Sequence, residues 1–164
     1  MKLYRVLVFA IALFVPLAAH SIEEGKPAPA FTAKLLNGEN FIAAGSNQVL
    51  LIHFWATWCE PCRKEMPDIE AFYGKHRGDG FRVIAVSMDD SADDAKVSDV
   101  MKAFSFDAAL SRNADFKGYG RIWRLPLSFV VDRAGILRRD GWYGEAGLDQ
   151  TSLEKDIAPL LGAK

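Results

Sequence analysis

The sequence predicts a single α/β domain built on a mainly parallel central sheet. Two almost uninterrupted apolar segments, residues 49–55 and 81–88, are typical of strands that are covered on both faces. Each is followed by a segment with apolar residues at helical spacing, so strand and helix alternate twice. Half of the 164 residues are hydrophobic and a quarter are charged, as in packed domains of this size. We therefore expect one core that needs no structural staples.

Residues 1–21 have the layout of a secretory signal peptide. Lys2 and Arg5 precede an apolar run over residues 6–19, and small residues end the segment near Ser21. The run is shorter than the ~20 residues that cross a bilayer as a helix, although an uncleaved anchor stays open. We expect residues 22–164 to fold in the periplasm or an equivalent extracytoplasmic space, where disulfides persist.

The first elements of the domain follow from local signals. Residues 22–45 are rich in Pro, Gly and Asn, and predict an irregular start with a hairpin that turns at Asn37 and Gly38. The strand at 49–55 is the expected centre of the sheet. A helix over residues 61–76 follows it, with a kink expected at Pro67.

The later elements continue the α/β pattern. A helix over residues 93–104 begins with acidic residues, which stabilise a helix N-terminus. The remaining elements are predicted as a short strand at 108–110, a helix at 113–123, strands at 127–131 and 136–139, and a closing helix with Leu153, Ile157, Leu160 and Leu161 on its apolar face.

The charge balance excludes one class of partner. The 20 basic and 21 acidic residues leave no excess of Lys and Arg to neutralise a phosphate backbone, and there is no long basic run. We therefore expect no nucleic acid partner.

The chemistry is expected where the central strand meets the first helix. Cys59 and Cys62 stand there, separated by two residues, so one helical turn brings their sulfurs together. A helix N-terminus favours an anion by only ~0.3–1 kcal/mol, less than one pKa unit. A hydrogen bond from the Cys62 thiol or amide has to supply the rest. We expect Cys59 to be the exposed, attacking sulfur and Cys62 the resolving one.

The segment from Phe54 to Cys62 resembles the active site of the thioredoxin superfamily, and more narrowly that of the exported TlpA/ResA-like thiol:disulfide oxidoreductases. Pro67 matches the kinking proline of that superfamily, and Leu125 and Pro126 resemble its cis-proline loop. The resemblance covers roughly residues 22–161 and implies a thioredoxin-like fold. This is a central mixed sheet flanked by helices, with an N-terminal hairpin and an inserted helix and strand at residues 91–110.

The resemblance also implies the site. Glu65 takes the position of a buried acid that carries a proton for Cys62, and Pro126 holds a cis peptide facing the disulfide. We assign catalysis to Cys59, Cys62, Glu65 and Pro126, and substrate binding to Trp58, Glu60, Pro61 and Leu125. No cofactor and no metal are expected. The sequence departs from the family at His53, where Asn is common, and at Leu127-Ser128, where Thr is common after the proline; we interpret His53 as a satisfied core histidine.

The residues around the sulfurs also favour a direction. Glu60, Glu65 and Asp68 outnumber Arg63 and Lys64, and an acidic site disfavours the Cys59 thiolate and so favours a reductant. The expected partners are thiols and disulfides of exported proteins and a membrane electron donor. The resemblance points to cytochrome c maturation as one setting. We expect a monomer.

Two other functions are weighed against this one. A peroxiredoxin-like peroxide reductase has a Pro and a Thr or Ser before its cysteine, at positions where this chain has Ile52 and Ala56. A copper-delivery module of the thioredoxin fold has three residues between its cysteines and a downstream His, whereas the last His here is His76. Both therefore fit less well than thiol:disulfide exchange.

Overall fold

A computed structural model describes residues 22–143 and 147–162, and the expected signal peptide lies outside the described residues. Within the described residues, seven strands form one mixed sheet in the order β2-β1-β5-β4-β3-β6-β7. The expectation of a mainly parallel sheet is wrong, because two neighbouring pairs, β3–β4 and β4–β5, are parallel and the other four are antiparallel. The strands are β1 (Thr32–Leu35), β2 (Asn40–Ile42), β3 (Val49–Trp55), β4 (Phe81–Ser87), β5 (Asp107–Asp115), β6 (Leu127–Val131) and β7 (Leu137–Arg139). The α-helices are α1 (Glu60–His76), α2 (Asp94–Met101), α3 (Gln150–Asp156) and α4 (Ala158–Leu161). Within the described ranges, no helix is long and apolar enough to span a membrane.

The centre of the sheet is the predicted pair of covered strands. β3 and β4 are parallel, and their register runs from Val49 beside Phe81 to Trp55 beside Ser87. Every residue of β3 is buried, which explains why its sequence is a continuous apolar run. Because both strands run in one direction, the loops that follow them leave the same edge of the sheet. The active-site loop and the loop after β4 therefore lie side by side.

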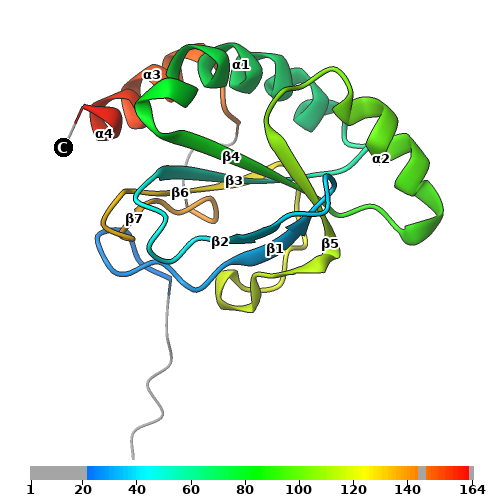
Figure 1. Cartoon of the computed structure of the whole chain (residues 1–164), viewed down its shortest axis with the longest axis horizontal. Coiled ribbons are helices and arrows are strands. Elements are labelled where there is room, and N and C mark those ends of the chain that lie inside the picture. The colour runs from blue at the N-terminus through cyan, green and yellow to red at the C-terminus, as the bar shows by residue number, and fades with distance from the viewer. Residues whose placement is uncertain (1–21, 144–146, 163–164) are drawn as a thin grey trace, which may run out of the picture.

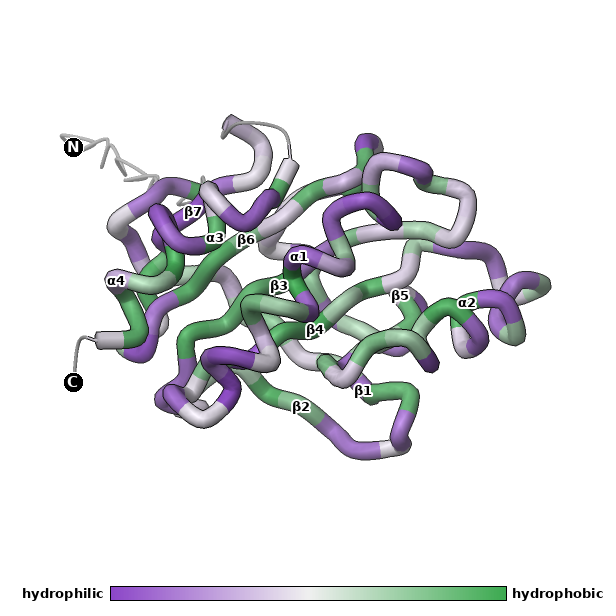
Figure 2. Tube along the Cα trace, turned by 90° about the horizontal axis from the view of Figure 1, so that it is seen from above, coloured by the Kyte–Doolittle hydropathy of each residue, from purple (hydrophilic) through white to green (hydrophobic). Residues whose placement is uncertain are grey.

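The α-helices gather on one face of the sheet (Figure 1). Side chains of β3 alternate between this face and the other. Leu51 and Trp55 pack with α1, α2 and α3, and Ile52 and Phe54 pack in a second cluster on the opposite face. Figure 2 shows the hydrophobic stretches along β3, β4 and β6, with more hydrophilic residues in the outer turns. The core thus has two layers, one on each face of the sheet.

The predicted helix over residues 113–123 is wrong. β5 continues to Asp115, and its last residues pair with β1 through Ala33 and Ala114. A single 3-10 turn, Lys117–Tyr119, follows. Gly118 lies so close to Pro29 that an added Cβ would stand 2.5 Å from the proline Cβ. Strand pairing and this close contact override the helical spacing of the apolar residues. Tyr119 is buried in the core cluster on the face of the sheet opposite to α1.

Other predicted elements are confirmed with adjusted ends. β1 and β2 form the hairpin, with Gly38 at φ 90° in the turn. The inserted helix and strand are α2 and β5. α1 stays helical through Pro67. The closing helix is split into α3 and α4, because Pro159 stands in the first turn of α4 and has no N–H to continue the helix.

Candidate active site

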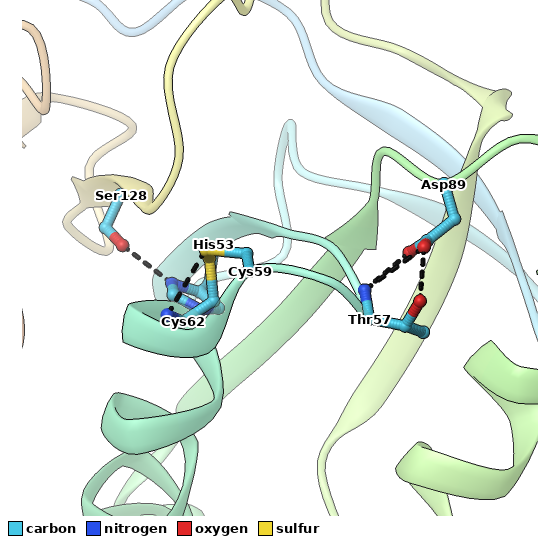
Figure 3. The surroundings of a disulfide bond; sticks show 6 residues. All are labelled: His53, Thr57, Cys59, Cys62, Asp89 and Ser128. Atoms are coloured by element: carbon cyan, nitrogen blue, oxygen red, sulfur yellow. Dashed lines mark hydrogen bonds between the residues drawn. A yellow bond between two sulfur atoms is a disulfide. The ribbon is translucent and has the colours of Figure 1, made fainter.

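The two cysteines lie at the start of α1, on the loop that follows the central strand. They are joined by a disulfide, with 5.3 Å between their Cα atoms. Cys59 is the N-cap residue of α1, and its Sγ accepts the backbone N–H of Cys62 at 3.3 Å. Figure 3 shows this arrangement. In the disulfide form the Cys59 sulfur therefore has the hydrogen bond from the Cys62 amide that we expect in addition to the helix dipole.

Cys59 is much less exposed than the sequence predicts. Cys59 is only 4% exposed and Cys62 is fully buried, so the order of accessibility is as expected but the outer sulfur is not open. The reason is the N-cap geometry, which turns the Cys59 side chain toward the helix end and toward Cys62. The adjacent Trp58 is 68% exposed. An incoming chain must therefore approach the sulfur across the surface of the loop.

Glu65 lies one turn after Cys62 and is half-buried. Burial raises the pKa of its carboxyl to about 7, against the opposing effects of a backbone hydrogen bond from Leu148 and the charge of Arg139. Its Oε2 is buried and, among the described residues, has no hydrogen-bond partner. A carboxyl with this pKa exists in both protonation states near neutral pH and can exchange a proton.

The peptide between Leu125 and Pro126 is cis, as the resemblance implied. It immediately precedes β6, whose Leu127 lies beside Phe54 of β3. Pro126 is therefore placed at the end of β3 where the active-site loop begins. Pro126 and Glu65 line the same small cavity, of about 20 Å³, which is about the room that one water molecule needs.

The other assigned residues are on the surface of the helix start. Pro61 occupies the first turn of α1, where a missing N–H costs nothing. Glu60 forms an ion pair with Lys64 at 2.8 Å, and this hydrogen bond and charge lower the pKa of the Glu60 carboxyl. Together with Trp58, these residues form the exposed rim beside the disulfide.

His53 is only half satisfied, which corrects the interpretation made from the sequence. Its side chain is fully buried, and Nδ1 makes a hydrogen bond of 2.9 Å with the hydroxyl of Ser128 on the neighbouring strand β6. Nε2 is buried and has no partner among the described residues. Burial lowers the pKa of His53 to about 4, so the ring is neutral at neutral pH. On β3 it alternates with Phe54 and so belongs to the face that carries α1.

Asp89 is a residue of the site that was not predicted from the sequence. This residue follows β4 and is only 5% exposed, and its carboxylate accepts hydrogen bonds from Thr57 in the active-site loop (Figure 3). One signal could have found it: Asp89 follows a strand predicted to run parallel to the one before Thr57, at the edge where such loops gather.

Comparison with known proteins identifies the group to which this site belongs. The sequence profile of the AhpC/TSA family matches residues 25–140. The chain belongs to the AhpC/TSA family. The Sporulation thiol-disulfide oxidoreductase A of Bacillus subtilis is 30% identical to it over 143 residues, which cover 85% of this chain and 86% of that protein.

A further relative of this AhpC/TSA family member and a solved structure agree with this. The thiol-disulfide oxidoreductase ResA of Bacillus thuringiensis subsp. konkukian is 34% identical over 118 residues, or 70% of this chain and 66% of ResA. The crystal structure of StoA from Bacillus subtilis matches with a TM-score of 0.59 and 28% identity, over 77% of this chain and 95% of StoA. The predicted thioredoxin-like fold and ResA-like group are confirmed, and the family member is a thiol:disulfide oxidoreductase.

Proposed function

We propose that this oxidoreductase reduces disulfides in exported proteins, with Cys59 as the nucleophile and Cys62 as the resolving residue. The observation that carries the assignment of Cys59 as the nucleophile is the backbone N–H of Cys62 on its sulfur at a helix N-terminus, whereas the reducing direction depends on the charges around the site. This donor and the partial positive charge of the helix end stabilise the Cys59 thiolate. Cys62 is fully buried, as suits a residue that attacks Cys59 from within the protein in the second step of the exchange.

The exchange has two balanced steps. The Cys59 thiolate attacks one sulfur of a substrate disulfide and forms a mixed disulfide, while the other substrate sulfur leaves as a thiolate. Cys62, after losing its proton, attacks Cys59 and releases the second substrate thiol. Two electrons thus pass to the substrate, and the enzyme ends with the Cys59–Cys62 disulfide. A donor of two electrons must then reduce it again.

Glu65 is the proposed proton acceptor for Cys62. The two residues are three apart on α1 and so lie on the same side of the helix. The pKa of about 7 means that a fraction of Glu65 is ionised at neutral pH and can take up a proton. Its small cavity beside Pro126 has room for a water molecule that could connect the carboxyl to the surface.

The proposed substrate is an extended segment that lies against Leu125 and Pro126. The cis peptide places the backbone of this loop at the end of β3, beside the start of the active-site loop. Backbone groups there can pair with an extended chain in the manner of an added strand. Trp58, Glu60 and Pro61 would contact the segment on the other side of the sulfurs, since Trp58 and the Glu60 side chain are exposed.

The reducing direction rests on local charge. The raised pKa of Glu65 leaves that carboxyl partly neutral at neutral pH, which weakens the excess of acids counted in the sequence. Asp89, held against the loop by Thr57, adds an acid that the count omitted. Negative charge near the sulfurs disfavours the thiolate and therefore favours delivery of electrons.

The proposed setting is the extracytoplasmic space, with a membrane protein as the electron donor and cytochrome c maturation as one use of the activity. It rests on the signal-peptide layout of residues 1–21 and on the exported group that the site resembles. The proposed partners are exported proteins with oxidised thiols, and the proposed form is a monomer.

The two alternatives are less well supported. The hydroxyl nearest to Cys59 in sequence belongs to Thr57, and it donates to Asp89 at 2.6 Å, so it is engaged and does not assist a peroxide. Ala56, three residues before Cys59, offers no hydroxyl at all. Over the described part of the chain, no cluster of three or more His, Cys, Asp or Glu residues could hold a metal ion.

The test is a covalent trap. In Cys62→Ser the second step cannot occur, so Cys59 should remain joined to its substrate, and the adduct should disappear on treatment with dithiothreitol. An extract of exported proteins supplies the substrates, and the double variant Cys59→Ser with Cys62→Ser is the matched control. Adducts that form equally in the control would remove Cys59 as the nucleophile. Wild-type protein that fails to accelerate reduction of insulin by dithiothreitol would contradict the proposed activity as a whole.

A further inference from the structure

A buried carboxylate holds the loop that carries Cys59. Asp89 Oδ1 accepts the hydroxyl of Thr57 at 2.6 Å, and Oδ2 accepts the backbone N–H of Thr57 at 2.9 Å and the hydroxyl of Ser87 at 2.9 Å. The Thr57 N–H also lies 3.1 Å from Oδ1. Both oxygens therefore have donors. We call Ser87, Asp89 and Thr57 the Asp89 network.

The sheet places this network beside the active site. β3 and β4 end side by side, with Trp55 next to Ser87, and the N–H of Met88 donates to the carbonyl of Trp55 at 2.8 Å. Thr57 stands two residues after Trp55, and Asp89 stands two residues after Ser87, so the two residues meet just beyond the ends of the strands. The carboxylate thus fastens the active-site loop to the end of the neighbouring strand.

The network is also close to the reactive sulfur along the chain. Two peptide units separate Thr57 from Cys59, so their Cα atoms lie at most about 7.6 Å apart. The loop between them is tight, because the N–H of Cys59 donates to the carbonyl of Ala56 at 3.0 Å. Asp89 is only 5% exposed, and a charge in such a setting is less screened by water and salt than a charge on the surface.

We propose that Asp89 is a positioning residue of the disulfide exchange: it fixes the loop through Thr57 and places a fixed negative charge near Cys59 that favours the disulfide over the dithiol. The inference rests on the exchange proposed for Cys59 and Cys62. Reduction of the disulfide takes up two electrons and two protons, and two glutathione molecules supply both as they become glutathione disulfide. Because a negative charge nearby disfavours the thiolate, it disfavours the reduced protein and makes it a stronger reductant.

The test is the equilibrium with glutathione. Asp89→Asn keeps the size of the side chain and one acceptor oxygen but removes the charge. We expect the equilibrium constant to shift about three- to tenfold toward the reduced protein; a tenfold shift corresponds to about 30 mV. The control is Asp132→Asn, which removes a partly buried acid that accepts the N–H groups of Ala134 and Ile136 in the turn between β6 and β7. An equilibrium within twofold of wild type for Asp89→Asn, or an equal shift in the control, would overturn the inference.

A second pair of variants tests the fixing of the loop and does not depend on Asp89→Asn folding. Thr57→Val removes the hydroxyl donor and keeps the carboxylate, so the rate of insulin reduction should fall about threefold while the glutathione equilibrium stays within about twofold. Thr57→Ser restores a hydroxyl and should restore the rate. Equal rates for Val, Ser and Thr would contradict the positioning role. If wild-type protein reduces insulin and these variants behave as wild type, only the role of Asp89 fails and the proposed function stands.

Discussion

The disulfide lies between two buried polar regions that differ in how completely their hydrogen bonds are made (Figure 3). On one side, both carboxylate oxygens of Asp89 accept donors from Thr57 and Ser87. On the side of His53 and Ser128, the ring makes one hydrogen bond, and Nε2 has no partner among the described residues; Oε2 of Glu65 on α1 is equally unpaired. The difference suggests two roles. A satisfied network fixes a geometry, whereas burial shifts the pKa values of His53 and Glu65, and a carboxyl with a pKa of about 7, such as Glu65, can move protons.

We expect the largest effect on stability from removal of the Asp89 carboxylate. Asp89→Ala leaves the buried hydroxyl of Ser87 and two part-buried donors of Thr57 without their acceptor, and we expect a loss of about 2–4 kcal/mol in the free energy of unfolding. Urea unfolding at neutral pH measures it. A loss below about 1 kcal/mol would mean that the network is not the firm attachment that the comparison requires.

The other side should tolerate removal of its polar groups. His53→Leu combined with Ser128→Ala deletes both members of the pair, and we expect a change within about 1 kcal/mol at neutral pH. The pKa of His53 is lowered from 6.5 to about 4, so the unfolded chain binds a proton that the folded protein does not, and wild type loses stability as pH falls through this range. This loss, about 2 kcal/mol between pH 7 and pH 5, should vanish in the double variant. Urea unfolding of wild type and the double variant at pH 7 and pH 5 measures this loss. If the double variant loses as much stability as wild type, His53 is not the neutral buried group described above.

Glu65 should act in the opposite direction with pH. Its pKa is raised from 4.5 to about 7, so the folded protein binds the proton more tightly than the unfolded chain, and stability falls as pH rises from 4.5 through 7. Because the side chain is partly exposed, we expect about 1–2 kcal/mol after allowance for solvent screening. Glu65→Gln should remove this component, so that the variant gains relative to wild type from pH 5 to pH 8.

The same variant sharpens the catalytic comparison. If Glu65 accepts the proton of Cys62, Glu65→Gln should slow the release of substrate about tenfold and change its pH profile near pH 7. Stopped-flow measurement of disulfide exchange at several pH values checks this. A variant with the wild-type pH profile would leave Glu65 with a structural role only.

The predicted elements that failed are those that depend on distant partners. Residues 113–115 have an acceptable helical pattern, but β1 offers a strand edge with which they pair, and the close contact of Gly118 with Pro29 then holds the following turn. Nothing within that segment reveals the approach of residues from the start of the domain. The break in the closing helix, by contrast, follows from a local signal, because Pro159 has no N–H with which to continue the helix.

The sequence by itself determined the two covered strands, the hairpin at Gly38 and the placement of Cys59 and Cys62 at a helix start, because apolar runs, turn residues and a three-residue spacing act locally. Tertiary structure alone decided the surroundings of the sulfurs. Three features depend on which strand lies next to which: the near-burial of Cys59, the His53 nitrogen that has no partner within the described ranges, and the attachment of Thr57 to Asp89. Solvent exclusion and hydrogen bonding between distant residues are set only when the sheet is assembled, and these same effects shift the pKa values on which the chemistry depends.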